Sequence, residues 1–379
     1  MLDHIDIEVL KGGSALRRQV RDFVETETFH RTPETWDSFN PDFSRKVAAE
    51  GWIGMTWPKR YGGGERSALE RYVITEELLA AGAPVRAHWA ADRQIGPILL
   101  AAGSEYLKEL LLPRIAAGEC FFCIGMSEPN SGSDLASIRT KASKADGGWL
   151  VSGQKVWSGY AHRAHYMNLF ARTSPFDKES RHKGVTQFVL DMSSPGITVR
   201  PIYNLANDHD FNEVIFDDVF VPDAMLIGEE GDAWGQVSGE LAHERAGAER
   251  WLGTFGLLTA LIDEVDAGIA SGDAERIGRV VAQVWTLHRM SLSIAASVRE
   301  GADLPTVAAL VKDMGTELDQ AVPEVARAVM TESRRLASPT GETFQRILRR
   351  STLYAPAYSI RGGTREILRG IIARGIGLR

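Results

Sequence analysis

The 379-residue sequence contains only two cysteines, no long apolar run and no long basic run. Two cysteines are too few for a disulfide framework. No stretch approaches about 18 apolar residues without a charge, so we expect no membrane span. The N-terminus has acidic residues among its apolar ones and no continuous apolar core of a signal peptide, so we expect a cytoplasmic protein. The formal net charge of −7 argues against a nucleic-acid partner.

The two cysteines, Cys120 and Cys123, have the C-x-x-C spacing of some redox and metal sites. We do not adopt that interpretation, because in the β-strand predicted here residues three apart point to opposite faces. No second cysteine pair is present to complete a zinc site, and we predict no metal.

The order of predicted elements divides the chain into three parts. Apolar residues recur at helical spacing through most of the first third, as in ALERYVITEELLAAG. From about residue 122 to 228 the segments are short, β-branched or aromatic, and separated by turn residues. Helical spacing then returns to the end. We therefore predict an α–β–α organisation with domains at 1–121, 122–228 and 229–379, and no internal repeat.

Two segments of the predicted β domain suit a phosphate-bearing or planar ligand. GMSEPNSGSD (125–134) offers hydroxyls and backbone amides after a predicted strand, although its composition alone favours a polar turn. In GGWLVSGQKVWSGYAHRAHY (147–166), Trp157 lies in a predicted strand and is followed by small residues, as a planar ring system would require. The alternative is that Trp157 is a core residue and that His162 and His165 are solvated loop residues.

With these two segments in one chain of α–β–α order, the sequence resembles the acyl-CoA dehydrogenase family. Further matches are GWIGMTWPKRYGG (51–63), QIGPILLAAGSEYLKELLLPRIAAGE (94–119), GEEGDAW (228–234) and GGTREILRGIIA (362–373). The resemblance runs nearly end to end. It implies an α+β protein with an N-terminal helical domain, a central β-barrel-like domain and a C-terminal four-helix bundle.

The resemblance also implies an FAD enzyme that removes an α,β hydrogen pair from an acyl-CoA thioester. The implied flavin contacts are Met126, Ser127, Ser133, Trp157, Ser158, Gly159, Thr364 and Glu366. The α-proton of a thioester is far too weakly acidic for a carboxylate in water. The family lowers this barrier by hydrogen-bonding the thioester carbonyl, excluding water and passing the β-hydrogen as hydride to the flavin. The expected electron acceptor is an electron-transfer flavoprotein.

The catalytic base departs from the pattern of many family members. These have a Glu directly before the Gly-Thr of the C-terminal loop, where this sequence has Gly362. Gly362 keeps the backbone N–H that polarises the thioester carbonyl, and we expect the missing side chain to leave room for a wide substrate. Other members, among them enzymes for branched or bulky acyl groups, place the base in a Glu-Arg pair on the first long helix after the β domain. This sequence has that pair in Glu244 and Arg245.

Helical spacing supports Glu244 as the base. Apolar residues at positions 248, 251, 255, 258 and 262 continue a stripe that begins at Glu244. A carboxylate at the head of a buried stripe should have a raised pKa and act as a base near neutral pH. Arg245 would position the helix or the substrate. Glu240 and Glu249 are alternatives, although Glu249 lies four residues after Arg245 and has the spacing of a surface pair.

A second departure concerns flavin binding between subunits. Homotetrameric members carry an Arg-x-x-Phe-Gly motif that reaches the flavin diphosphate of a neighbour, whereas this sequence has the short linker AGIASGDAE (267–275). This resembles the heteromeric acyl-CoA dehydrogenases of steroid side-chain degradation. Either FAD is bound without that arm or a different subunit supplies it. We hypothesise the second, in which a homologous second subunit supplies the missing contacts in an α2β2 assembly. The alternatives are a flavin monooxygenase of the same fold, which needs no α-proton base, and a non-catalytic subunit.

Overall fold

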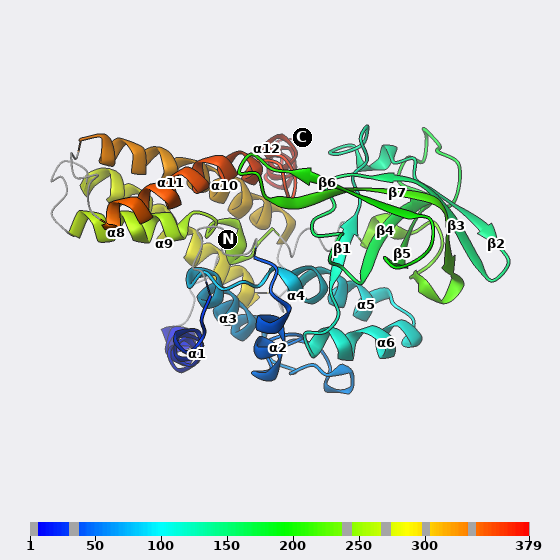
Figure 1. The fold of residues 1–379 in the computed structure, drawn as a ribbon, viewed down its shortest axis with the longest axis horizontal. Coiled ribbons are helices and arrows are strands. Elements are labelled where there is room, and N and C mark those ends of the chain that lie inside the picture. Colours follow the sequence, from blue (N-terminus) through cyan, green and yellow to red (C-terminus); the bar gives the residue numbers. More distant parts are fainter. Residues whose placement is uncertain are drawn as a thin grey trace. The chain divides into compact units, whose positions relative to one another are not determined.

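The computed structural model describes residues 7–29, 38–236, 245–266, 274–297, 304–332 and 339–378 (Figure 1). The chain divides into two compact units, which are described separately. The sheet unit comprises Phe39–Arg66 and Val85–Leu241. The helical unit comprises Met1–Ser38, Ser67–Pro84 and Ala242–Arg379.

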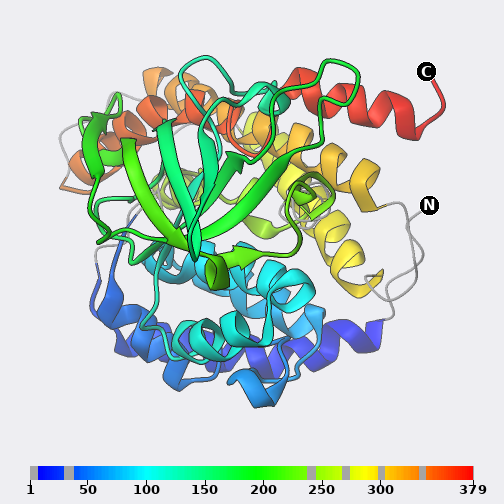
Figure 2. The same ribbon diagram turned by 90° about the vertical axis from the view of Figure 1, so that its right-hand side faces the viewer.

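The sheet unit contains an eight-stranded sheet (Figure 2). Its strands are β1 Phe122–Gly125, β2 Lys141–Ala145, β3 Gly148–Lys155, β4 Tyr166–Arg172, β5 Val185–Asp191, β6 Ile197–Tyr203, β7 His209–Pro222 and β8 Leu226–Ile227. The order is β6-β7-β3-β2-β4-β5-β8, and β1 pairs with β4 in parallel. The β3–β7 ladder ends where Lys155 pairs with Val214, so the first residues of β7 extend beyond the end of β3.

The central strands β4 and β5 are covered on both faces. Met167, Leu169 and Phe188 belong to one apolar cluster. Phe170 and Val185 belong to a second cluster, as expected for side chains that alternate across a strand. Burial on both faces explains why apolar residues occupy successive positions at 169–171 and 188–190 rather than alternating ones. The buried amides of Asn168 and Gln187 bond to each other at 2.9 Å.

The helices of the sheet unit are α2 Pro41–Ala49, α4 Arg86–Ala90, α5 Gly96–Ala102 and α6 Glu105–Ala116, with a π-helical turn, η2 Ala91–Ile95, between α4 and α5. Two of them, α2 and α6, begin at polar caps. The Asn40 side chain accepts a hydrogen bond from Phe43 N at 3.0 Å, and Ser104 Oγ accepts one from Leu107 N at 3.2 Å. Such caps satisfy amides that the first helical turn leaves without partners.

The helical unit contains α1 Ile7–Thr26, α3 Ala68–Ala80, α8 Phe255–Asp266, α9 Ala274–Ser297, α10 Leu304–Glu332, α11 Pro339–Tyr358 and α12 Arg365–Gly375. α10 packs against α9, α11 and α12, and α3 packs against α1 and α9. The buried Glu76 of α3 pairs with Arg17 of α1 and with His288 of α9, each at 2.6 Å. These contacts of Glu76 tie α1 and α3 to α9.

The succession of helices, strands and helices agrees with the order predicted from the sequence. The N-terminal helices are shared between the units, because α1 and α3 lie in the helical unit and α2, α4, α5 and α6 in the sheet unit. The domain boundaries at residues 121 and 228 stay a prediction. In the part of the chain that the structure describes, no helix has the length and apolarity that a membrane crossing requires.

Candidate active site

The loop after β1 is attached to the end of β3 through its carbonyl groups. Lys155 Nζ donates to the Met126 carbonyl at 2.9 Å, and Val156 N donates to the Ser127 carbonyl at 2.9 Å. The side chains of Met126 and Ser127 are both half-buried. Two predicted flavin contacts therefore lie on a loop whose backbone is fixed against a strand.

A buried ion pair supports the same loop. Lys155 is fully buried and donates to Glu128 Oε1 at 2.9 Å, while the Glu128 carboxylate also accepts from Arg139 N and Thr140 N. Burial lowers the pKa of Lys155 to about 8, partly offset by Glu128. Burial raises the pKa of Glu128, but Lys155 and Thr140 outweigh this and hold it below its ordinary value. Both groups are therefore charged at neutral pH.

Ser133 lies at the exposed end of the loop. On one side of it, Ser131 Oγ donates to the Asp134 carbonyl at 2.8 Å. On the other, the Asp134 carboxylate pairs with Arg181 at 2.7 Å. The hydroxyl of Ser133 is accessible to a ligand on this side of the loop.

Trp157 is neither in a strand nor in the core, so both of those sequence interpretations are wrong. β3 ends at Lys155, and Trp157 lies beyond it with a φ of +62°, in the left-handed region rather than the extended one. Its side chain is 59% exposed and makes an edge contact with Phe211, with ring centroids 6.0 Å apart. A large indole is thus presented on the surface of the sheet unit.

Ser158, the next residue, has a fully buried side chain. Its Oγ has no hydrogen-bond partner among the residues that the structure describes. A buried hydroxyl without a partner is costly, and such groups are rare in native proteins. Together with the exposed indole of Trp157, it fits a flat ligand that carries hydrogen-bonding heteroatoms.

Gly159 completes this segment and has little room for a side chain. A Cβ atom there would lie 2.4 Å from Arg86 Nη2. The Arg86 guanidinium in turn lies over the Tyr160 ring, 5.4 Å from its centroid. His162 and His165 are exposed loop residues, which confirms the interpretation that these two histidines are solvated.

The glycine pair of the C-terminal loop lies in the helical unit and requires glycine at both positions. Gly362 and Gly363 have φ values of +72° and +103°. Arg245 Nε donates to the Gly362 carbonyl at 3.0 Å. Among the described residues, the Gly362 N–H has no acceptor, so it is available to a ligand carbonyl.

The space beside Gly362 is filled, which corrects the expectation that the missing side chain leaves room. A Cβ atom at Gly362 would lie 3.0 Å from Nη1 of Arg250, whose residue is 4% exposed. Gly363 is similarly close to Arg245, since a Cβ there would lie 3.3 Å from its Nη2. Two buried guanidinium groups therefore flank the glycine pair.

Thr364 and Glu366 lie at the start of α12. Thr364 is the N-cap residue, and Glu366 is in the first helical turn. Hydrogen bonds from its own backbone N–H and from Thr364 lower the pKa of Glu366, so it is ionised at neutral pH. An acidic residue at this position also suits the positive end of the helix dipole.

Glu244 and the alternative Glu240 lie outside the described residues. The structure does correct the continuous helix predicted to follow Glu244. Residues 245–254 form turns and a short 3-10 helix, η5 Ala248–Arg250, and α8 begins only at Phe255. Asp319 of α10 explains the late start, because its carboxylate accepts from Thr254 N at 2.9 Å and from Thr254 Oγ at 3.0 Å.

Glu249 is not the surface residue that its spacing from Arg245 indicated. It is 3% exposed, because the expected helix is absent and the chain turns Glu249 inward. The apolar stripe is only partly altered. Ala248, Trp251 and Leu258 are buried as expected, while Phe255 and Ile262 are half-buried.

Asp319 is a buried titratable group that the sequence analysis missed. It is 1% exposed, and burial raises its pKa to about 7 although Thr254 opposes the shift. Lys312, on the same helix, donates to the Tyr358 carbonyl at 2.6 Å just before the glycine loop. Lys312, Thr316 and Asp319 have the spacing of one helix face, and this polar stripe in an apolar helix was the available signal.

The two cysteines are buried and free. Burial raises the pKa of the Cys120 thiol to about 12, and that of Cys123 is also raised. Neither thiol ionises at neutral pH, which agrees with the interpretation that the C-x-x-C spacing is structural.

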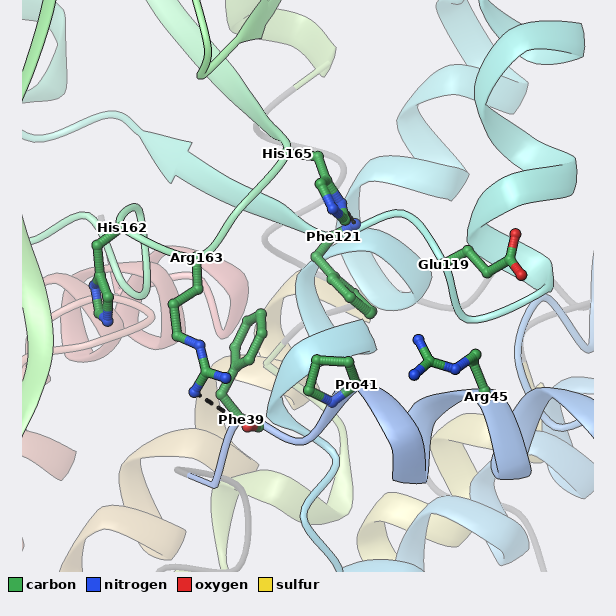
Figure 3. Close-up of a pocket in the computed structure, with 8 residues that line it drawn as sticks. All are labelled: Phe39, Pro41, Arg45, Glu119, Phe121, His162, Arg163 and His165. Atoms are coloured by element: carbon green, nitrogen blue, oxygen red, sulfur yellow. Dashed lines mark hydrogen bonds between the residues drawn. The ribbon is translucent and has the colours of Figure 1, made fainter.

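The sheet unit also contains a pocket of about 610 Å³ (Figure 3). Arg45 and Glu119 line one side, and His162 and Arg163 the other (Figure 3). The remaining lining residues are Phe39, Pro41, Phe121 and His165. Arg163 Nη1 donates to the Phe39 carbonyl at 3.3 Å, so a hydrogen bond joins two of the lining residues. None of the predicted flavin contacts lines the pocket.

Comparisons with known proteins agree along the chain. Residues 13–119 match the family model for the acyl-CoA dehydrogenase N-terminal domain, and residues 123–219 match the model for the middle domain. Acyl-CoA dehydrogenase FadE29 of Mycobacterium tuberculosis is 32% identical over 340 residues, which cover 87% of this chain and 86% of that protein. The chain belongs to the acyl-CoA dehydrogenase family. The predicted class, a flavin-dependent oxidoreductase family, is thereby confirmed.

A second relative is longer than this chain. Acyl-CoA dehydrogenase FadE34 of Mycobacterium tuberculosis is 34% identical over 340 residues and 88% of this chain. Those residues cover 46% of FadE34, so the chain spans less than half of that protein.

Solved structures confirm the predicted acyl-CoA dehydrogenase fold, with N-terminal helices, a central sheet domain and C-terminal helices. The ChsE4-ChsE5 complex from Mycobacterium tuberculosis has a TM-score of 0.84 at 28% identity, covering 100% of this chain and 99% of that chain. The Tcur3481-Tcur3483 steroid ACAD G363A variant has a TM-score of 0.85 at 25% identity, covering 97% of this chain and 99% of that chain.

Proposed function

We propose that the protein catalyses FAD-dependent α,β-dehydrogenation of an acyl-CoA thioester with a bulky or branched acyl group. The observation that carries the proposal is the buried Ser158 hydroxyl, which has no partner within the described ranges, beside the exposed indole of Trp157 in a chain of this family. Such a site offers a planar ring system both a stacking surface and a hydrogen bond.

FAD, when bound, supplies the acceptor for the β-hydrogen and its electron pair. In the sheet unit, Met126, Ser127 and Ser133 would hold it on one loop, and the segment from Trp157 to Gly159 would contact its ring system. In the helical unit, the proposed contacts are Thr364 and Glu366 at the start of α12.

The α-proton is proposed to pass to the Glu244 carboxylate. The Gly362 N–H donates to the thioester carbonyl and stabilises the negative charge that develops there. Arg245 fixes the Gly362 carbonyl and thereby orients the peptide that follows it. The substrate loses one proton and one hydride, a Cα=Cβ double bond forms, and the product is a 2-enoyl thioester.

The acyl group is proposed to be large, and a steroid side chain is one candidate. Support comes from the Glu-Arg pair at residues 244 and 245, and from the similarity to a structure named as a steroid acyl-CoA dehydrogenase. The filled space beside Gly362 means that the missing side chain alone does not provide this width.

A homologous second subunit is the proposed partner. The sequence lacks the Arg-x-x-Phe-Gly motif, and a similar solved structure is a complex of two named chains, ChsE4 and ChsE5. An α2β2 assembly would let the partner supply the missing arm to FAD. The reduced flavin would then pass its electrons to an electron-transfer flavoprotein.

The proposal is tested on the assembly purified with its natural partner. Anaerobic mixing with saturated acyl-CoA thioesters, including straight-chain, branched and steroid side-chain members, should bleach the flavin absorption and yield the 2-enoyl thioester. Oxygen consumption without enoyl product, unaffected by Glu244→Gln, would favour the monooxygenase. No bleaching with any thioester would favour a non-catalytic subunit. A full flavin complement and normal turnover in the chain purified alone would contradict the second subunit.

A further inference from the structure

Asn212 is a polar residue at an inward position of an otherwise apolar stripe. Along the start of β7, Asp210, Asn212, Val214 and Phe216 are the buried residues of an alternating pattern. Asn212 is fully buried. A buried amide needs partners for its donors and its acceptor, so its position in the stripe calls for an explanation.

Its partner on one side is the backbone of Ser158. Ser158 N donates to the Asn212 carbonyl at 3.1 Å, and Asn212 Nδ2 donates to the Ser158 carbonyl at 3.0 Å. The β3–β7 ladder has already ended at Lys155, and the left-handed Trp157 lies between. The backbone N–H groups of Ser158 and Tyr160 continue the pairing with β7, and the Asn212 side chain is the group that holds the Ser158 carbonyl in a segment that is no longer a strand.

Two histidines hold the other end of the amide. His162 Nδ1 lies 3.2 Å from Asn212 Oδ1, and His209 Nε2 lies 2.7 Å from the same oxygen. An amide oxygen only accepts, so both ring nitrogens carry hydrogen in this arrangement. The rings also stack, with centroids 3.8 Å apart and an interplanar angle of 15°. The Ser158 carbonyl fixes this orientation of the amide, because a rotated amide would place its oxygen against that carbonyl.

The two bonds between Asn212 and Ser158 position the backbone that carries two donors without acceptors among the described residues. In a trans peptide the C=O and the next N–H point in opposite directions. Because Asn212 holds the Ser158 carbonyl, the Gly159 N–H points away from Asn212. The Gly159 N–H has no acceptor among the described residues, and neither does Ser158 Oγ. A ligand with acceptor heteroatoms would satisfy both groups.

We propose that Asn212, held by the stacked pair His162 and His209, is a positioning residue that aims the Gly159 N–H and Ser158 Oγ at the heteroatoms of the flavin ring. The inference rests on the proposed function for the identity of the ligand. The hydrogen bonds of Asn212 to Ser158, His162 and His209, here called the Asn212 brace, do not depend on the ligand. The brace acts through Ser158 and makes no contact with the substrate.

The test compares Asn212→Asp with wild type in the full assembly. The aspartate keeps the shape and the acceptor oxygen but loses the Nδ2–H donor and adds a charge behind the flavin. We expect a lower flavin midpoint potential and flavin reduction slowed by roughly 10- to 100-fold, the scale of a misplaced reacting group. Asn204→Ala is the matched control. Asn204 bonds to Asp210 in the same hairpin and has no bond to Ser158, so it should leave the potential unchanged.

A second readout needs no flavin. Hydrogen exchange in a peptide spanning residues 157–160 should be roughly 2- to 10-fold faster in Asn212→Asp, the scale of one lost hydrogen bond. If exchange is faster but wild type binds no flavin, the brace stands and the proposed function fails. Unchanged exchange together with an unchanged potential would overturn the inference. A potential that shifts equally in Asn204→Ala would also overturn it, because a loosened hairpin would then suffice.

Discussion

The candidate groups of the sheet unit and those of the helical unit are held in different ways. In the sheet unit, the backbone of Ser127 and Ser158 is bonded to neighbouring segments at the end of β3. In the helical unit, the Gly362 loop follows a helix, and the long cationic side chains of Arg245 and Lys312 bond to the carbonyls of residues 362 and 358. The first site is positioned by backbone pairing and the second by buried cations.

The difference indicates how each site should respond to substitution. Backbone pairing is shared among many bonds, so a sheet-unit site should fail only when a buried group beneath it loses its partner. A loop held by single long side chains depends on its own conformation and on each cation separately.

Replacing Lys155 should have the largest effect on stability. Lys155→Met leaves Glu128 buried without its cation, and we expect a loss of about 3–5 kcal/mol in the free energy of unfolding. Urea unfolding measures it. Lys144→Met is the matched control, since Lys144 pairs with Asp223 at the surface and should change stability by about 0–1 kcal/mol. Recovery of most of the loss in Lys155→Met with Glu128→Gln would confirm the cause, whereas equal effects at both lysines would contradict it.

Acid should weaken the sheet unit through His88. Burial lowers the pKa of this histidine to about 3, with Arg93 adding to the shift, and its Nδ1 lies 2.8 Å from Ser44 Oγ. Below the unfolded pKa of about 6.5 the unfolded chain binds the proton and the folded unit does not. The free energy of unfolding therefore decreases as the pH is lowered, and at pH 5 it is roughly 2 kcal/mol below its value at neutral pH. Hydrogen exchange of sheet-unit peptides, corrected for its intrinsic pH dependence, should show this loss, and His88→Asn should remove it.

Asp319 should act in the opposite direction in the helical unit. Its folded pKa of about 7 exceeds the unfolded value, so the folded unit binds a proton first as the pH falls. The contribution of Asp319 to stability rises between pH 7 and pH 5, by roughly 2 kcal/mol, and is lost as pH rises through 7. Exchange of α10 peptides should slow on acidification, and Asp319→Asn should abolish that slowing. Equal responses of both units to acid would contradict the assignment.

A glycine substitution should have the smallest of these effects. Gly362→Ala forces a left-handed alanine whose Cβ lies 3.0 Å from Arg250, and we expect a loss of about 1–2 kcal/mol. Gly370→Ala is the control, because Gly370 lies inside α12 with space around it and should gain about 0.5–1 kcal/mol. Thermal unfolding of the two variants should therefore shift in opposite directions.

Much of the fold could be predicted from the sequence, because element type follows local periodicity. The α–β–α order follows from that periodicity. The family was identified separately, from the resemblance of its motifs. Trp157 was misplaced because the apolar pattern of GGWLVSGQKVW continues past the strand, and no pattern reveals a positive φ. Glu249 was misplaced because the helix expected to contain it gives way to turns, where Asp319 caps Thr254 from 65 residues away.

The candidate site was predictable only in part. Motif matches indicate which residues belong to it, but they do not show what supports those residues. The pairs of Lys155 with Glu128 and of Asn212 with Ser158 join positions 27 and 54 residues apart. A buried polar residue within an apolar stripe was the available clue in both β7 and α10.

The most direct test of the account is flavin reduction in Glu244→Gln. In the purified assembly, mixed anaerobically with a thioester that bleaches wild type, the variant should retain its FAD. Its reduction should be slower by roughly 100- to 10,000-fold, the contribution of a general base. Glu240→Gln and Glu249→Gln serve as controls and should reduce at near the wild-type rate. Retention of most of the reduction rate in Glu244→Gln would contradict the assignment and place the base elsewhere.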